Sequence, residues 1–418
     1  MKKMSRQALW VLAGVILIRG FASGGINMTA SLFLAPVAQE LGTGIGSLSI
    51  YFSIMSVVTV LWLPIAGKLL SRFPVRPVAF AAAALQALTF ACFGLLDKPV
   101  GWYLLSIPQA MGTTIVVSLL SPILIHRWFP HNTGLILGVQ MAFVWVFAAG
   151  LQQLASGLIA SEGWRSAYIS MGLLTFSVVA AAIFIFLRDK PDEASQTSPL
   201  AGKARAEAEG EDIQIPEAVA TRSASFIFLL IFMITMTGAA VFTQHIPAYG
   251  GVMGYTLRQV GMAMSFASIG SAIGSVAIGL ICDRIGGLKT CCIIIFLWLL
   301  AVGGFLAGGS GFAIFILSAF LHGVASSAIA VLAPMLTLIF YGKMDYEKIY
   351  AKVSMGAPLA SILLVPAYGF VYDATGSYFY VLVLLLAMLG ASFASIMLGW
   401  RRRCTAAGCP AWRRPKEE

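Results

Sequence analysis

The chain has 418 residues, of which 59% are hydrophobic and 11% are charged, and its formal net charge is +10. A soluble domain carries about 25% charged residues, so this composition excludes a protein whose surface lies mainly in water. The positive charge is scattered among short loops rather than gathered on a soluble domain, so we expect no nucleic-acid partner.

Long apolar runs predict membrane-spanning helices. A spanning helix needs about 20 mostly apolar residues and a barrel strand about 10 with alternation. The runs at 226–242 and 380–400 are long and do not alternate. We predict an all-α membrane protein with twelve transmembrane helices, over residues 8–34, 46–70, 77–96, 101–125, 133–160, 165–187, 224–246, 257–281, 289–308, 311–339, 349–371 and 377–400. The first run lacks a cleavage site, which favours a permanent helix over a cleaved signal.

Lysine and arginine gather on one side of this arrangement. Of the 27, Lys98, Arg165 and Arg258 fall on the other side and Arg19 falls inside a helix, which leaves 27 − 4 = 23 on the side of the two termini. Cytoplasmic loops carry such an excess. We therefore predict a multi-pass protein of the inner or plasma membrane, surrounded by lipid, with both termini in the cytoplasm.

Prolines and glycines recur at a constant spacing. Five positions have counterparts 211 to 213 residues later: Pro36 and Pro247, Gly42 and Gly254, Gly67 and Gly279, Pro122 and Pro334, Gly163 and Gly376. Such a spacing is typical of parallel repeats related by an axis along the membrane normal. We predict two pseudo-symmetric six-helix bundles, 1–188 and 223–400, a cytoplasmic linker, 189–222, and a basic cytoplasmic tail, 401–418.

Other chemistry finds little support in the sequence. Most of the six cysteines lie in helices or on the predicted cytoplasmic side, where disulfides are rare. Cys404 and Cys409 have no two further metal ligands nearby. We find no nucleotide-binding loop, catalytic triad or HExxH motif. We expect no catalytic residue, no metal site and no cofactor.

Residues 279–289, Gly-Leu-Ile-Cys-Asp-Arg-Ile-Gly-Gly-Leu-Lys, resemble the loop signature of the major facilitator superfamily, G-x-x-x-D-R-x-G-x-x-K. The sister loop at 67–76 keeps the glycine and the basic residues but has Ser71 where the family usually has aspartate. With twelve helices in two halves and a long central loop, the resemblance extends over the whole chain. It implies a membrane transporter.

This loop signature predicts a gate at the cytoplasmic end. Asp283 and Arg284 follow Gly279 where helix 8 leaves the membrane, and Arg72 lies in the sister loop. A carboxylate there can cap a helix N-terminus or pair with a base across the seam between the halves. The alternative interpretation is a solvated turn.

A narrower resemblance points to one group of carriers. Residues 126–134, His-Arg-Trp-Phe-Pro-His-Asn-Thr-Gly, are similar to the R-W-F-P-x-x-x-G of oxalate/formate antiporter-like and monocarboxylate carriers, and 244–249 resemble the end of their helix 7. Those carriers move small organic anions. They commonly place a basic residue in helix 8 and sometimes in helix 11, where this chain has Ser275 and Ala357.

Arg19 is the basic residue inside a predicted helix. It lies about 11 residues into helix 1, or about 16 Å deep. A charge there is costly unless it faces water or a partner, and none of the 17 acidic residues falls in the middle of a helix. The carboxylate of a substrate would supply the counter-ion. Alternatively, Arg19 bonds backbone carbonyls or extends to the interface.

His322 marks a polar stripe on helix 10. Ser318, His322 and Ser326 are four residues apart and share one face. Because histidine titrates near physiological pH, His322 could carry a coupling proton or bind substrate. The alternative is a packed, neutral histidine bonded to a neighbouring helix.

The superfamily resemblance implies that helices 1, 4, 7 and 10 line a central cavity. The uncharged candidates for substrate contact on helices 1, 4 and 7 are therefore Asn27, Gln109, Thr113, Thr237, Gln244 and His245, and Gln140 of helix 5 is a further one. Thr237 and Gln244 are seven apart, which predicts a common face. Each could instead form a hydrogen bond between helices.

Three hypotheses remain. The first is a secondary carrier, which we expect to be monomeric, for a small organic anion such as a monocarboxylate. The second is an exporter of amphipathic or cationic compounds, favoured by aromatic and methionine-rich helices. The third is a non-transporting receptor or scaffold, which would need an output domain larger than the linker or tail.

Overall fold

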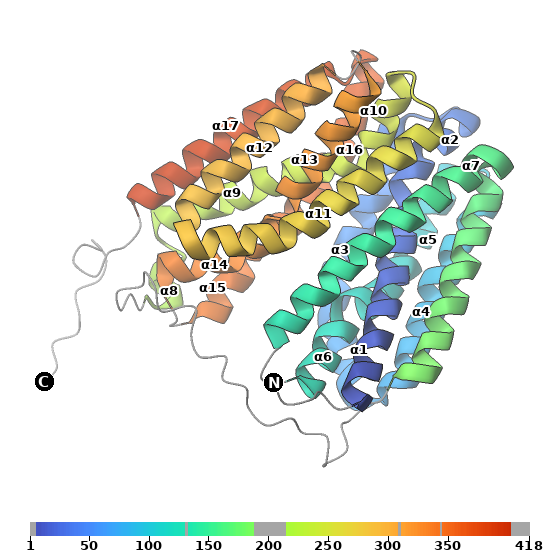
Figure 1. Cartoon of the computed structure of the whole chain (residues 1–418), viewed down its shortest axis with the longest axis horizontal. Helices are drawn as coiled ribbons and strands as arrows, with labels where there is room; N and C mark the ends of the chain where they lie inside the picture. The colour runs from blue at the N-terminus through green and yellow to red at the C-terminus, as the bar shows by residue number, and fades with distance from the viewer. Residues whose placement is uncertain (1–5, 130–132, 188–214, 308–310, 343–344, 403–418) are drawn as a thin grey trace, which may run out of the picture.

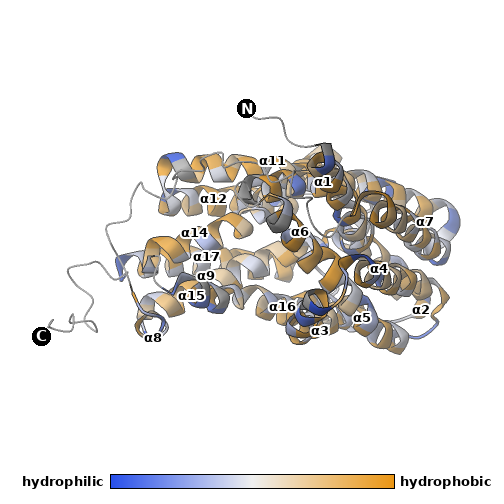
Figure 2. Cartoon of the chain, turned by 90° about the horizontal axis from the view of Figure 1, so that it is seen from below, coloured by the Kyte–Doolittle hydropathy of each residue, from blue (hydrophilic) through white to orange (hydrophobic). Residues whose placement is uncertain are grey.

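A computed structural model describes residues 6–129, 133–187, 215–307, 311–342 and 345–402, and every regular element in these ranges is a helix. The middle of the resembling motif, 130–132, most of the predicted linker and the tail from 403, with Cys404 and Cys409, lie outside the described residues. Large apolar side chains such as Leu61, Phe184 and Phe296 are 59–68% exposed. Figure 2 shows hydrophobic colour along most of the helices, as expected of membrane-spanning segments.

The first half contains six membrane-crossing passes. The first pass consists of α1, the π-helix η1 and α2, and the fourth pass consists of α5, the π-helix η3 and α6. The elements are α1 (Arg6–Arg19), η1 (Gly20–Asn27), α2 (Ala30–Leu41), α3 (Ile45–Arg72), α4 (Val75–Cys92), η2 (Phe93–Leu95), α5 (Pro99–Thr113), η3 (Thr114–Leu119), α6 (Leu120–Trp128) and α7 (Thr133–Phe186).

Two passes are contained in α7. Its 54 residues would extend about 80 Å, far more than the ~30 Å hydrocarbon core. Gly163 breaks the helical geometry with φ 81° and ψ 164°, a conformation that glycine adopts readily. The structure has eleven apolar segments long enough to span a membrane, and the turn at Gly163 makes the segment at 136–186 two passes. The twelve-helix prediction is confirmed.

The second half repeats the pattern after a short helix that precedes it. Its seventh, tenth and eleventh passes are interrupted, and they consist of α9, η5 and α10, of α13 and α14, and of α15 and α16. The elements are α8 (Glu217–Ala220), α9 (Ala224–Val241), η5 (Phe242–Gln244), α10 (Ile246–Val252), α11 (Leu257–Ile285), α12 (Gly287–Leu306), α13 (Phe312–Ser326), α14 (Ile329–Tyr341), α15 (Tyr346–Ser354), α16 (Gly356–Thr375) and α17 (Phe379–Arg401).

The two halves converge near α2 and α10 and diverge toward α6 and α14 (Figure 1). We call the converging end the closed end. The diverging end is the one at which α1 begins and α17 finishes. Two seams join the halves: α3 lies against α16, and α11 lies against the first pass of α7.

A carboxylate closes the first seam. Asp373, near the last turn of α16, accepts hydrogen bonds from the backbone N–H groups of Ile45 (3.0 Å) and Gly46 (2.7 Å), the first residues of α3. The first amide groups of a helix have no partner within it and carry partial positive charge. The second half therefore caps a helix of the first half.

Backbone contact and serine bonds continue both seams. A Cβ atom on Gly369 would lie 2.5 Å from the Cα of Gly46, so this contact requires glycine. Farther along, Ser53 Oγ donates to the carbonyl oxygen of Ile362 at 2.7 Å. In the second seam, Ser268 Oγ donates to Gln152 Oε1 at 2.8 Å. All these contacts lie toward the closed end.

Replacing Asp373 with Asn should loosen the closed end. A carboxylate at a helix N-terminus contributes about 0.3–1 kcal/mol, so the open population should rise up to about fivefold. The measurement is the rate at which a maleimide labels Ala248→Cys, which is buried at the closed end, in a background without native cysteines. Asp97→Asn is the control, because Asp97 pairs with Arg165 within one half. An equal rise in the control would show that Asp373 is no latch.

Candidate functional site

A cavity of about 450 Å³ lies between the two halves. Its walls come from the first, second, fourth, seventh and eleventh membrane passes, through the elements η1, α2, α3, α5, α9, η5 and α16. The lining residues are Asn27, Ala30, Phe52, Met55, Ser56, Thr59, Val60, Leu63, Gln109, Val241, Gln244, Pro358, Ser361 and Val365. None of these residues is charged. The lining is apolar except for amide and hydroxyl groups, an arrangement typical of small-molecule sites.

The side-chain carbonyl oxygen of Gln109 is unpaired among the described residues. The residue is 1% exposed, and its Oε1 atom has no hydrogen-bond partner among the described residues. One turn along the helix, the buried Oγ1 of Thr113 is also unpaired there. A buried polar atom without a partner costs about 1–3 kcal/mol. A solute in the cavity could supply the partner that Gln109 lacks.

Asn27 ends the π-helix η1, a geometry that occurs frequently at functional sites. Gln86 Nε2 donates to the carbonyl oxygen of Ala22 at 3.1 Å and to Asn27 Oδ1 at 3.5 Å. The amide N–H groups of Asn27 therefore remain available to the cavity that the residue lines.

Arg19 is the last residue of α1 and is not in the cavity lining. It donates from Nη1 to Gln140 Oε1 at 3.4 Å, whereas its buried Nε has no partner among the described residues. The ion pairs recorded for the described residues do not include it. Arg19 directly precedes the π-helix η1, whose last residue, Asn27, lines the cavity.

Gln140 is a support for this arginine. It is fully buried, and its Nε2 donates to Ser121 Oγ at 2.7 Å and to the carbonyl oxygen of Val15 at 3.3 Å. These bonds turn Oε1 toward Arg19. The guanidinium is held by a neutral amide, which leaves its positive charge uncompensated.

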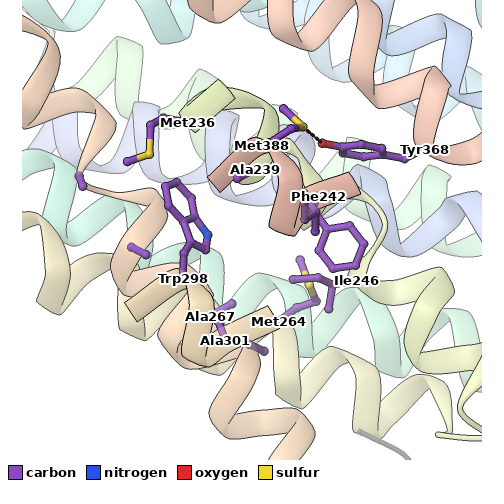
Figure 3. Packing of buried hydrophobic residues seen from close by; sticks show 14 of the residues in the cluster. Met236, Ala239, Phe242, Ile246, Met264, Ala267, Trp298, Ala301, Tyr368 and Met388 are labelled. Carbon is purple, nitrogen blue, oxygen red and sulfur yellow. Dashed lines mark hydrogen bonds between the residues drawn. The ribbon is translucent and has the colours of Figure 1, made fainter. Parts of the chain in front are cut away.

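The predicted stripe on helix 10 lies inside the second half. His322 is 1% exposed, and its Nδ1 accepts from Trp298 Nε1 at 3.2 Å. The proton is therefore on Nε2, which donates to Thr243 Oγ1 at 2.9 Å. Ser326 Oγ donates to the carbonyl oxygen of His322 at 2.7 Å. Trp298 and Phe242 lie in the buried hydrophobic cluster (Figure 3), and both rings pack edge-on against the imidazole of His322. Neither His322 nor Ser326 lines the cavity.

Helix 7 contributes one of its three candidates to the cavity. Gln244 lines it together with Val241, whereas Thr237, one turn earlier on α9, is buried outside the lining. A substrate contact at Thr237 stays a prediction. His245 is fully buried and donates from Nε2 to the carbonyl oxygen of Val365 at 2.7 Å.

The predicted gate residues lie at the diverging end. Arg72 and Arg284 are exposed, and a Cβ atom on Gly279 would meet nothing within 4 Å. The side chain of Asp283 lies outside the described residues. The ion pairs recorded in the described ranges each join side chains of the same half. The gate stays a prediction for a conformation in which this end is closed.

The polar residues that α3 and α16 contribute to the cavity were not among the predicted site residues. Ser56, Thr59 and Ser361 line the cavity. The candidates were taken mainly from passes 1, 4, 7 and 10, so these three residues were not considered. The signal was present in α3, where Ser53, Ser56 and Thr59 recur every three residues in an otherwise apolar run.

Replacing Gln109 with Leu should raise the stability of the unliganded protein. The change removes a buried amide that forms no recorded bond, and the expected gain is about 1 kcal/mol or more. Gln140→Leu is the matched control and should destabilise by several kcal/mol, because it breaks three bonds and leaves Arg19 unsupported. Thermal unfolding without ligand measures both. If Gln109→Leu is as destabilising as Gln140→Leu, the amide of Gln109 has a structural partner.

Comparison with known proteins places this geometry in context. A family model described as Major Facilitator Superfamily matches residues 15–291 and 254–415. The oxalate:formate antiporter of Oxalobacter formigenes is 23% identical over 274 residues, which cover 64% of this chain and 61% of that protein, less than two thirds of its length.

Solved structures share the fold at low identity. The nucleoside transporter NupG has a TM-score of 0.71 and 13% identity, over 95% of this chain and 99% of that one. A bacterial homologue of the iron transporter ferroportin, in an inward-facing state, has a TM-score of 0.66 and 14% identity, over 97% and 100%. The names of these proteins refer to different cargoes, so the fold alone does not identify the solute.

Proposed function

Because the chain belongs to the major facilitator superfamily and is therefore a transporter of a small-molecule solute, we propose that it is a secondary carrier for a small organic anion, a monocarboxylate. The observation that carries the proposal is Arg19, whose guanidinium lies within a membrane-spanning helix and has no recorded acidic partner. A charge in that position needs a counter-ion. Arginine binds a carboxylate through two parallel hydrogen bonds.

The number of charges favours one carboxylate. Within the described spans, Arg19 is the one charged residue that lies far from the span ends, and the cavity lining is uncharged. A monocarboxylate neutralises one guanidinium, whereas a dicarboxylate would carry a second negative charge into a site without a second cation. The relative named as an oxalate:formate antiporter supports an organic anion as cargo.

The neutral groups of the cavity would orient the rest of the solute. Asn27, Gln109 and Gln244 present amides from helices of both halves, and the amide of Gln109 has an unused acceptor. A solute that bonds residues of both halves favours the conformations in which they approach each other. In this proposal Arg19 supplies charge and the amides supply shape selection.

The positive-inside distribution supports a cytoplasmic location for both termini. With that orientation, the latch at Asp373 closes the outer end and the diverging end faces the cytoplasm, an inward-facing state. No acidic residue lies in the interior of the described spans, which favours exchange or facilitated movement over proton symport through a membrane carboxylate. We propose that the carrier acts as a monomer in the inner or plasma membrane.

A second candidate is an exporter of amphipathic compounds. It rests on the lining itself, which is mainly apolar and includes Phe52, Met55 and Leu63. Such a cavity accepts apolar ligands through burial rather than charge. Under this alternative Arg19 has a structural role through Gln140.

Thermal stabilisation by candidate solutes separates the two functions. A ligand that binds only the folded state stabilises it by about 2.7 kcal/mol at 100 times its Kd. We expect small monocarboxylates to stabilise the wild type, with dicarboxylates weaker. The effect should be lost in Arg19→Gln and partly kept in Arg19→Lys. Arg258→Gln, an exposed arginine at the start of α11, is the control. Stabilisation by amphipathic cations alone, unchanged in Arg19→Gln, would reject the anion carrier.

A further inference from the structure

A second hollow, of about 520 Å³, lies on the first half and shares no lining residue with the central cavity. Residues of α3 and α4 form its walls, and Met111 of α5 and Ile115 of η3 complete them. Phe73 and Leu85 in its walls are 55% and 39% exposed, so the hollow opens to the outside of the bundle. All of its lining side chains are apolar or aromatic. We call it the α3–α4 groove.

The groove has the length of one membrane leaflet. Along α3 it extends from Trp62 to Phe73, just past the last residue of that helix. Eleven residues of helix rise about 16 Å, which is half of the ~30 Å hydrocarbon core. It therefore extends from about the middle of the membrane to the surface at the diverging end.

Two arginines flank its surface end. Arg72 is on the last turn of α3 and Arg76 on the first turn of α4, on either side of Phe73 and Pro74, which line the groove. Both are exposed, and the ion pairs recorded for the described residues include neither. Arg76 Nε donates to the carbonyl oxygen of Leu187 at 2.6 Å, which fixes its position without neutralising it. The mouth of the groove is positive and its interior is apolar.

We propose that the α3–α4 groove binds an anionic phospholipid, with one acyl chain between α3 and α4 and the phosphate between Arg72 and Arg76. Acyl chains are the surrounding solvent of this face, and the two positive charges select a lipid with net negative charge. A basic residue near the membrane surface strengthens binding of an anionic lipid about fivefold. Lipid composition would then affect the helices that also line the central cavity, because α3 contributes to both.

Native mass spectrometry of the full chain, purified from nanodiscs of equimolar phosphatidylglycerol and phosphatidylcholine, tests the proposal. The wild type should retain phosphatidylglycerol in preference to phosphatidylcholine. Arg72→Gln should reduce that preference about fivefold. Ala81→Phe places a ring in the groove and should reduce retention of both lipids. Arg284→Gln, the counterpart in the sister loop, is the matched control and should behave as wild type.

Four results would overturn the proposal. Equal retention of the two lipids by the wild type would remove the charge selection. An equal loss in Arg72→Gln and Arg284→Gln would assign the preference to diffuse surface charge. Normal lipid retention in Ala81→Phe would place the bound lipid outside the groove. A second protein bound in the groove in place of lipid would identify a different occupant. Because Ala81→Phe and Arg72→Gln change different contacts, misfolding of one variant leaves the other informative.

Discussion

A membrane-spanning chain has no water in the hydrocarbon to satisfy its polar groups, and most of this structure depends on that constraint. Backbone groups are satisfied within helices. Polar side chains must find partners in neighbouring helices, and most do so: Gln86 bonds helix 1 from helix 3, and Gln152 bonds helices 1 and 8 from helix 5. In the part of the chain that the structure describes, the buried side-chain groups without a partner are few, and they are informative for that reason.

The same constraint shapes the contact between the halves. Two apolar bundles gain little from burying apolar surface against each other in lipid, so their association needs close packing and specific polar contacts. Gly46 and Gly369 provide the first by bringing two backbones together, and Asp373 provides the second by capping α3. Such contacts are local and few, which suits a seam that must separate and re-form.

The sequence predicted what depends on length, composition and periodicity. Apolar runs gave twelve helices, and repeated glycines marked their ends, including Gly163 within α7. Three cavity residues, Asn27, Gln109 and Gln244, were also predicted. What escaped prediction depends on three-dimensional register. The cavity lining includes Val241 but not Thr237 one turn before it, and one partner of His322 is Trp298, 24 residues away on another helix. No local pattern contains either fact.

Gln109 and Gln140 show why residue type alone could not separate scaffold from site. Both are buried glutamines in apolar helices of the first half, and their sequence contexts do not distinguish them. Gln140 uses both ends of its amide, on Val15, Ser121 and Arg19. The Oε1 atom of Gln109 has no partner among the described residues, and Gln109 lines a cavity. Folding accounts for the first, since its bonds offset the cost of its burial. Folding alone does not account for the second, because an apolar residue of the same size would serve the core better. An amide held unpaired beside an empty volume makes sense when its bonds are completed by something that enters and leaves.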